Sequence, residues 1–289
     1  MKETQKLYDY ISCIRQQNKV DIHSIINTTL VINPYITNFP KDFLLDNFKK
    51  ENKLKLFIFH SVKFYFFNVI RFIFFIQIFF YHKLLYKKPK HDISKHDLIL
   101  DIYVLVDGVI KENKFNDNYF PALYPILKKN KIKHMFIPRL YGLSSNPFKL
   151  HQQLKSFFQV INKDTNNFLF EAELLSAKDF FQLAWLILYY PFKTLSQLVK
   201  EKNQQDASFN SHLLRDISKQ QFDAFSRYIF GKNIAKISDI SKIYSWSEFQ
   251  VIERAFNYAI RKNSDIKVYA CQFLVSHPVY FNMHVQDVD

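Results

Sequence analysis

The chain has 289 residues, 48% of them hydrophobic, so it can bury a substantial core and is not a disordered polypeptide. Its formal net charge of +14 favours an anionic partner: nucleic acid, an anionic membrane surface or a phosphorylated substrate. The two cysteines, Cys13 and Cys271, are far apart, which argues against a disulfide framework and fits a reducing compartment.

Residues 1–50 mix short apolar clusters with turn signals such as Asn33-Pro34 and Phe39-Pro40. They predict a small helical unit ahead of the rest of the chain. We expect this unit to serve packing, because none of its residues forms a recognisable chemical motif.

Residues 51–91 form a segment that is both apolar and basic. Leu54 to Tyr81 is dense in Phe and Ile, and no acid occurs between Glu51 and Asp92. The basic residues of this interval are Lys53, Lys55, Lys63, Arg71, Lys83, Lys87, Lys88 and Lys90. Clustered positive charge around an apolar helix predicts association with an anionic membrane surface.

Three arrangements of this segment remain open. A span from Phe64 to Tyr81 has 18 residues, barely enough to cross a bilayer, and places Arg71 near its middle at a cost of about 2.5–3.5 kcal/mol. Basic residues flank both ends, which suits a peripheral or monotopic helix better than a span. Against that, the polar positions spread around the helix and predict modest amphipathicity. An ordinary buried helix is the third arrangement, and we favour the peripheral or monotopic one.

From residue 92 onward, strands alternate with helices. Leu98 to Val106 is apolar almost throughout, which predicts a parallel strand buried on both faces. Further strands are predicted at His134–Ile137, Asn167–Phe170, Ser241–Tyr244 and Lys267–Cys271. This alternation predicts an α/β fold with a Rossmann-like parallel sheet and flanking helices over residues 92–289.

Helices are expected between these strands. Their ranges are 119–130, 148–162, 177–200 with a break or kink at Pro191, 211–230 ended by Gly231, and 248–261, with a polar surface linker at 201–210. Neither G-x-G-x-x-G nor a P-loop motif occurs, so we expect no dinucleotide cofactor. The histidines, including His91 and His96, lack metal-ligand spacing, so we expect no metal and place them in solvent.

Four charged residues follow predicted strands: Asp107, Arg139, Glu171 and Glu248. The carboxyl ends of parallel strands share one edge of the sheet, where ligands bind. An acid there could take a proton from an acceptor hydroxyl, and an arginine could hold a phosphate. Each of them can equally cap a helix or end a strand.

Asp117 and Tyr119 lie in the loop before a predicted helix and are further candidates for substrate binding. An Asx turn or an N-cap explains Asp117 equally well.

Two stretches carry a resemblance to a known family. Residues 115–133 read F-N-D-N-Y-F-P-A-L-Y-P-I-L-K-K-N-K-I-K, and residues 244–262 read Y-S-W-S-E-F-Q-V-I-E-R-A-F-N-Y-A-I-R-K, followed by K-V-Y-A-C-Q. Together they resemble bacterial surface-carbohydrate biosynthesis proteins of the GT-B glycosyltransferase type. Glu248, Gln250 and Glu253 match the E-N-Q segment of that family, whereas Phe249 replaces its asparagine and Ala270-Cys271 replace the G-Y of its last strand.

The resemblance covers residues 98–272. It implies transfer of a sugar from a nucleotide-sugar donor to a lipid-linked or polysaccharide acceptor in capsule or lipopolysaccharide biosynthesis. It places the protein at the cytoplasmic face of the inner membrane. We expect Asp107, Glu171 and Glu248 as catalytic residues and Arg139, Asp117, Tyr119 and Gln250 as substrate-binding residues.

In GT-B enzymes the acceptor-side domain precedes the nucleotide-sugar domain, and residues 92–289 correspond to the first of these. The second is expected to be absent or supplied by a partner, which leaves open whether the chain is an active enzyme. The alternative is a non-catalytic, membrane-associated component that binds a glycolipid or a partner transferase. A nucleic-acid binder is disfavoured, because the basic residues cluster around Phe and Ile.

Overall fold

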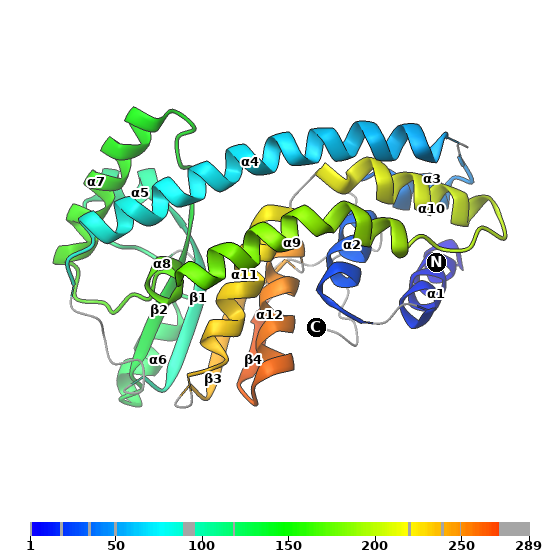
Figure 1. Ribbon diagram of the computed structural model, residues 1–289. Coiled ribbons are helices and arrows are strands. Elements are labelled where there is room, and N and C mark those ends of the chain that lie inside the picture. The colour runs from blue at the N-terminus through cyan, green and yellow to red at the C-terminus, as the bar shows by residue number, and fades with distance from the viewer. Residues whose placement is uncertain are drawn as a thin grey trace.

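The computed structural model describes residues 2–17, 20–33, 36–48, 51–88, 96–117, 119–218, 221–237, 240–248 and 250–271. In these residues it is an α/β structure, with twelve α-helices and one four-stranded, all-parallel sheet (Figure 1). The strand order is β2-β1-β3-β4, and the strands are β1 (Leu98–Leu105), β2 (His134–Tyr141), β3 (Lys242–Trp246) and β4 (Lys267–Cys271). The predicted α/β class and parallel sheet are confirmed.

Four helices precede the sheet: α1 (Lys2–Gln17), α2 (Ile22–Ile32), α3 (Phe39–Leu44) and α4 (Lys53–Leu85). The segment between β1 and β2 contains α5 (Val106–Glu112) and α6 (Leu123–Lys129). The long segment between β2 and β3 contains α7 (Pro147–Lys163), α8 (Glu171–Leu174), α9 (Ala177–Ser196), α10 (Gln204–Arg215), a 3-10 turn (Asp216–Ser218) and α11 (Gln221–Ile234). The last helix, α12 (Val251–Asn263), connects β3 to β4.

The sheet lies between two layers of helices. Leu100 and Ile102 of β1 pack on one face with residues of α7, whereas Ile99 packs on the other face with residues of α11 and α12. β1 is therefore buried on both faces, as its unbroken apolar sequence predicts. Val106, expected to end this strand, instead begins α5.

The predicted strand at 167–170 is wrong. This segment meets the sheet through a single parallel bridge, Phe136 to Phe168. Phe136 donates to the Asn167 carbonyl at 2.9 Å and accepts from the Leu169 N–H at 2.8 Å. The next ladder bond would need an N–H on Pro138, which proline lacks, and Glu171, the donor after that, already begins α8.

The predicted linker at 201–210 is also wrong, because its second half belongs to α10. Asn203 caps this helix by accepting from the backbone N–H of Asp206 at 2.8 Å. Asn210 is buried and bonds both the N–H and the C=O of Val199 at 2.9 Å. The polar residues that suggested a surface loop therefore cap and anchor a packed helix.

The helix expected over 211–230 is two helices, α10 and α11, separated by the 3-10 turn. Gly231 lies inside α11 and does not end it. A Cβ at Gly231 would lie 2.9 Å from the carbonyl oxygen of Phe256 and from Cβ of Ala259. The glycine therefore permits close approach of α11 and α12, which bury Phe230 and Phe256 against the sheet. The helix α9 continues through Pro191 as one element.

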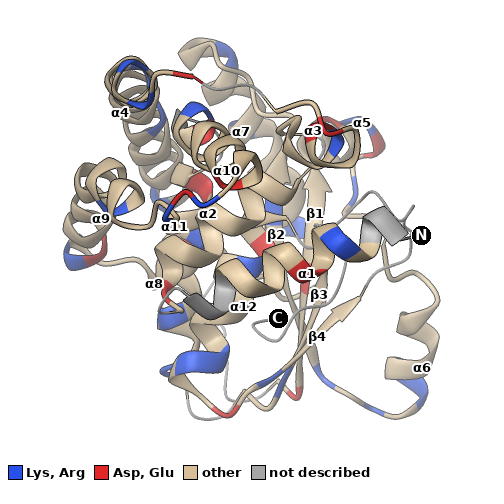
Figure 2. Cartoon of the chain, turned by 90° about the vertical axis from the view of Figure 1, so that its right-hand side faces the viewer, with Lys and Arg blue, Asp and Glu red and all other residues tan. Residues whose placement is uncertain are grey.

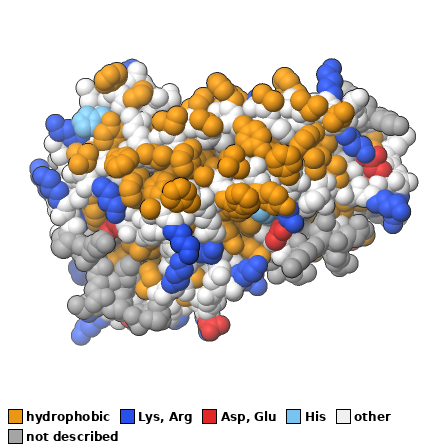
Figure 3. Space-filling model, viewed as in Figure 1, with side chains coloured by type: hydrophobic (Ala, Val, Ile, Leu, Met, Phe, Trp, Pro, Cys, Tyr) orange, Lys and Arg blue, Asp and Glu red, His pale blue; other side chains and the backbone are white. Residues whose placement is uncertain are grey.

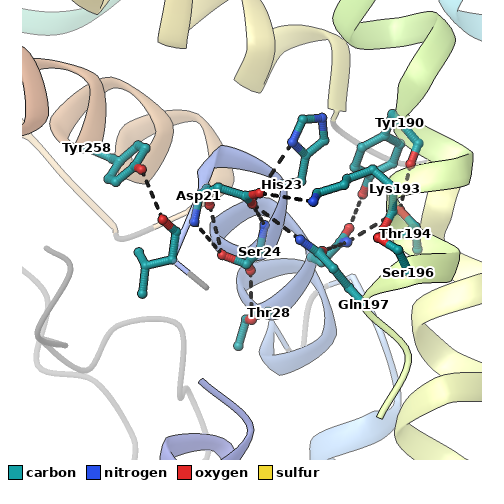
Figure 4. Close-up of polar contacts among 12 residues, drawn as sticks. Asp21, His23, Ser24, Thr28, Tyr190, Lys193, Thr194, Ser196, Gln197 and Tyr258 are labelled. Carbon is teal, nitrogen blue, oxygen red and sulfur yellow. Dashed lines mark hydrogen bonds and ion pairs between the residues drawn. The ribbon is translucent and has the colours of Figure 1, made fainter. Parts of the chain in front are cut away.

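The N-terminal helices share their cores with α9 to α12. Residues of α2 pack with α9, α11 and α12, and residues of α1 and α3 pack with α10. Figure 4 shows the polar contacts that attach the start of α2 to α9. Asp21 accepts from Gln197 Nε2 at 3.3 Å and lies 3.5 Å from Lys193 Nζ, while Asn27 donates to Gln197 at 2.6 Å.

The helix α4 has 33 residues and is about 50 Å long. It runs across the molecule from α10 and the 3-10 turn at one end to α7 at the other (Figure 1). It is the one helix in the described residues that is long and apolar enough to cross a membrane.

We expect Gly231→Ala to lower the free energy of unfolding by about 1–3 kcal/mol, because the new methyl group would press on the backbone of α12. Gly108→Ala in α5 is the matched control, since its Cβ would have no neighbour closer than 3.7 Å and alanine favours the helix. Urea unfolding monitored by circular dichroism measures both. Equal effects of the two substitutions would contradict this account of Gly231.

Candidate functional site

The strand order creates a topological switch point at the carboxyl edge of the sheet. The chain adds β2 on one side of β1 and β3 on the other, so the crossovers diverge between β1 and β3. β1 pairs with β2 along its whole length but with β3 only over residues 99–101. Ligands bind at such points in parallel α/β sheets.

A buried charge network is centred on Asp101 of β1, whose side chain is fully buried. Both of its carboxylate oxygens accept from Arg227 Nη2 of α11 at 2.9 Å, and Ser245 Oγ of β3 donates at 2.7 Å. Arg139 Nε lies 3.3 Å from Asp101. Because a buried carboxylate needs a buried cation, Asp101 connects the sheet to α11.

Arg139 lies inside β2, opposite Tyr103, and not beyond the end of a strand as predicted. Its guanidinium donates to Glu253 Oε1 at 2.9 Å and to the Trp246 carbonyl at 2.5 Å, and it covers the Tyr103 ring at 3.9 Å. Burial alone lowers the pKa of Arg139, but Asp101, Tyr103 and Glu253 outweigh burial and raise it. The charged side chain of Arg139 therefore links β2 to α12.

Of the three family-matching residues Glu248, Gln250 and Glu253, Glu253 is the one that joins this network. It is fully buried at the start of α12, where it accepts from the Tyr103 hydroxyl at 2.5 Å and from the Gln250 backbone N–H at 2.7 Å. Burial, and then the Glu253 charge, raise the pKa of Tyr103. The family-matching residue in the network is therefore an acid that caps its own helix.

A pocket of about 350 Å³ opens above the network. Its apolar wall comes largely from α4, α7 and the chain around α8, through Phe75, Ile78, Phe79, Phe158, Phe170 and Leu175. Its polar wall comes from the start of α8 and from α11, through Glu171, Asp223, Ser226 and Arg227. The pocket is therefore amphiphilic, with carboxylates on one side and hydrocarbon on the other.

Two carboxylates face this pocket. Glu171 Oε1 accepts from Arg227 Nη1 at 3.0 Å. Asp223 lies 3.4 Å from Arg71 of α4 and keeps 51% of its side chain exposed. Partial removal of water by the surrounding protein raises the pKa of Asp223, Arg71 lowers it, and Glu171 raises it further, with a net rise. A carboxyl with a raised pKa is suited to proton transfer.

His82 of α4 closes the apolar end of the pocket. Only 4% of it is exposed, and neither ring nitrogen has a hydrogen-bond partner among the described residues. It packs against the rings of Tyr86 and Phe170, each at 5.1 Å. Burial, with a smaller effect from Lys83, lowers the pKa of His82 to about 3, so this imidazole is neutral at physiological pH.

The structure brings two of the predicted site residues, Glu171 and Arg139, into the pocket wall. Asp107 lies in the first turn of α5, exposed, and accepts from Gln153 Nε2 at 2.6 Å. Glu248 accepts from Gln250 Nε2 at 3.1 Å just before α12. These three side chains, Asp107, Glu248 and Gln250, lie outside the pocket lining.

Asp117 and Tyr119 also lie outside the pocket lining. The carboxylate of Asp117 is buried and accepts from the backbone N–H groups of Tyr119 and Phe120 at 2.8 and 3.1 Å, and from the hydroxyl of Tyr124. This is the Asx-turn arrangement that the sequence left open. Tyr119 packs on Trp246 at 4.4 Å.

Sequence reasoning missed Asp101, Arg227, Asp223 and His82. Asp101 carried a usable signal, because an acid inside a strand buried on both faces requires a buried cation. Arg227, Asp223 and His82 gave no sequence signal. They lie on helices, and tertiary packing decides which side of a helix is buried. His96, expected in solvent, is buried with Nε2 2.8 Å from Asn167 Nδ2, and His91 lies outside the described residues.

The two guanidiniums at the pocket already donate to carboxylates. Arg227 is engaged by Asp101 and Glu171, and Arg139 by Glu253 and the Trp246 carbonyl. A phosphate would have to displace these partners, whereas hydroxyl groups can accept from and donate to the same network without changing its charge. The pocket therefore suits an uncharged, hydroxyl-bearing group.

Comparison with family models, curated proteins and solved structures finds no match to this chain. The geometry of the pocket and its charges therefore carries the functional argument.

We expect Arg227→Met to lower the free energy of unfolding by about 3–5 kcal/mol, because it leaves the buried Asp101 carboxylate without its main cation. Arg71→Met is the matched control. It removes an exposed pair with Asp223, which contributes about 0–1 kcal/mol. Urea unfolding at neutral pH measures both variants, and a loss for Arg227→Met no larger than for Arg71→Met would show that the network does not hold the sheet to α11.

Proposed function

We propose that the protein binds a lipid-linked sugar acceptor at an anionic membrane surface and serves as the acceptor side of a sugar-transfer reaction. In this proposal the sheet and the pocket belong to the Rossmann-like acceptor domain of a GT-B type transferase, and α4 lies in the cytoplasmic leaflet as a monotopic helix. The observation that carries the proposal is the distribution of polar residues around α4.

The helix α4 exposes many large apolar side chains, whereas most of its buried residues are polar. Its buried residues are Ser61, Phe64, Asn68 and His82, three of which are polar. Its exposed side carries Leu54, Ile58, Phe59, Val62, Phe66, Phe67, Val69, Ile70, Ile73, Phe80 and Leu84, each at least 42% exposed. Water disfavours this arrangement, whereas the apolar region of a membrane favours it.

A second helix extends the same apolar surface. α9 contacts α4 and exposes Phe181, Trp185, Leu188, Tyr189 and Phe192. Figure 3 shows the resulting band of hydrophobic side chains, with Lys and Arg at parts of its margin. α4 carries Lys and Arg but no acid, as Figure 2 also shows. An apolar band with a basic margin is complementary to an anionic membrane.

The same helix connects this surface to the pocket. Phe75, Ile78, Phe79 and His82 of α4 form one wall of the pocket, while Phe80 and Leu84 point away from the protein. A membrane-embedded α4 therefore places the pocket at the level of the lipid headgroups, where a lipid-linked sugar would lie. The expected chemistry is removal of a proton from an acceptor hydroxyl by Glu171 or Asp223.

The pairing of both pocket arginines with carboxylates favours the second candidate function, a non-catalytic component that binds the glycolipid for a partner transferase. The diphosphate of a nucleotide sugar has no free guanidinium in this pocket, so a donor site has to come from elsewhere. The two candidates share the acceptor pocket and differ in whether sugar is transferred.

We expect the purified chain to float with vesicles that contain anionic phosphatidylglycerol. Trp185→Ser and Phe181→Ser should each weaken this association by about tenfold, because each removes apolar surface from the membrane. Ile126→Ser on α6, which is 55% exposed and far from α4 in Figure 1, is the matched control. Equal weakening by all three substitutions, or no flotation, would contradict a membrane-facing α4–α9 surface.

Sugar transfer is tested with vesicles of bacterial membrane lipids and a panel of tritiated nucleotide sugars, by counting label in the lipid phase. We expect Glu171→Gln or Asp223→Asn to lower transfer by about 100-fold or more. The exposed Glu112→Gln in α5 is the control, and Asp107→Asn tests the sequence-based assignment of the base.

Saturable glycolipid binding without transfer would select the non-catalytic component. Absence of both binding and transfer would contradict the proposed function.

A further inference from the structure

The pocket does not end at its apolar wall. A second, much smaller cavity of about 10 Å³ adjoins it and shares Phe75, Leu175 and Ser226 with it. This cavity lies between α4, α9 and α11 and is otherwise lined by Asp179, Phe180, Leu183 and Ile229. It is only large enough for about one water molecule, so the passage is closed in this conformation.

The side chain of Phe180 fills the space between α4 and α9. Phe180 of α9 contacts the rings of Phe79, Phe75 and Phe72 on α4 at 4.9, 5.8 and 6.4 Å. Phe75 and Phe79 also line the main pocket. The ring of Phe180 therefore fills the α4–α9 seam, which we define as the contact of Phe72, Phe75 and Phe79 with Phe180.

The seam adjoins the exposed apolar surface. Phe181, the next residue along α9, is 77% exposed, and Ile73 and Phe80 on α4 are 61% and 59% exposed. Each is the neighbour in sequence of a seam residue: Phe181 follows Phe180, Ile73 follows Phe72 and Phe80 follows Phe79. An apolar route thus leads from the exposed band, past Phe180, to the apolar half of the pocket.

We propose that the hydrocarbon chain of a lipid-linked ligand enters the pocket between α4 and α9 by displacing the ring of Phe180, while its uncharged headgroup stays at the carboxylate side. This inference rests on the proposed function, because it assumes that the ligand arrives from a membrane. The ligand class is an amphiphile with a hydroxyl-bearing head and a long alkyl or isoprenoid chain.

The physical reason is that the chain never meets water along this route. Phe180 exchanges contacts with Phe rings for contacts with methylene groups, so apolar surface stays buried throughout. The polar wall of the pocket, formed by Glu171, Asp223 and Arg227, stays with the headgroup. A ligand without a chain gains nothing from the seam.

The test compares hexyl and dodecyl maltoside, which share a headgroup and differ in chain length, by calorimetry with the full chain below the micelle concentrations. We expect dodecyl maltoside to bind the wild type at one site at least about tenfold more tightly than hexyl maltoside. Phe180→Trp, which fills the seam, should reduce this ratio to about one and leave hexyl maltoside unchanged.

Phe148→Trp on α7 is the matched control, because this side chain is 83% exposed and lies outside both the pocket lining and the seam, and it should leave both affinities unchanged. Phe180→Ala, which opens the seam, should accelerate dodecyl maltoside association several-fold in stopped-flow fluorescence and covers the case in which Phe180→Trp does not fold. Loss of the chain-length ratio through Phe148→Trp as well, or adventitious binding only at the outer apolar surface, would overturn the route.

The two proposals fail in different ways. Equal binding of both maltosides to the wild type would leave the headgroup site standing and overturn the chain route. Binding of neither would overturn the acceptor pocket itself and the route with it.

Discussion

A fully buried carboxylate in the centre of the sheet sets the constraint on which the site depends. Asp101 has no contact with water, so its charge has to be met by cations brought in from other elements. Arg227 from α11 and Arg139 from β2 meet it, and Glu171 and Glu253 in turn engage these arginines. The network fixes α8, α11 and α12 against the carboxyl edge of the sheet and thereby shapes the polar wall of the pocket.

The second organising feature is α4, which serves two surfaces at once. Ser61, Asn68 and His82 are buried against the protein, whereas many of its large apolar side chains are exposed. An exposed apolar surface of this extent is typical of a contact with a membrane or a partner. The same helix supplies the apolar wall of the pocket. A ligand that belongs to a membrane and a pocket that is half hydrocarbon are thus joined by one element, which is why the proposed acceptor and the proposed location support each other.

Much of the fold could be predicted from local patterns, since the strands over 98–105, 242–246 and 267–271 all show as short apolar runs. The segment 167–170 has the same pattern but not the same structure, because Pro138 of β2 has no N–H to continue the ladder and α8 begins at Glu171. The polar stretch 201–210 failed for the opposite reason, since Asn203 and Asn210 satisfy backbone groups of a packed helix. In both places hydrogen bonds override composition.

The sequence by itself determined the α/β class, the parallel sheet and the apolar, basic character of residues 53–85, because hydrophobic period and charge clustering are local properties. It also named Glu171 as a candidate, although the strand at 167–170 that suggested this residue does not form. Only the tertiary structure decided that Asp107 stays outside the pocket, and that Asp101, Arg227 and Asp223 gather beneath or around it. The partners of a buried charge come from distant segments, and which side of α4 faces solvent depends on what packs against its other side.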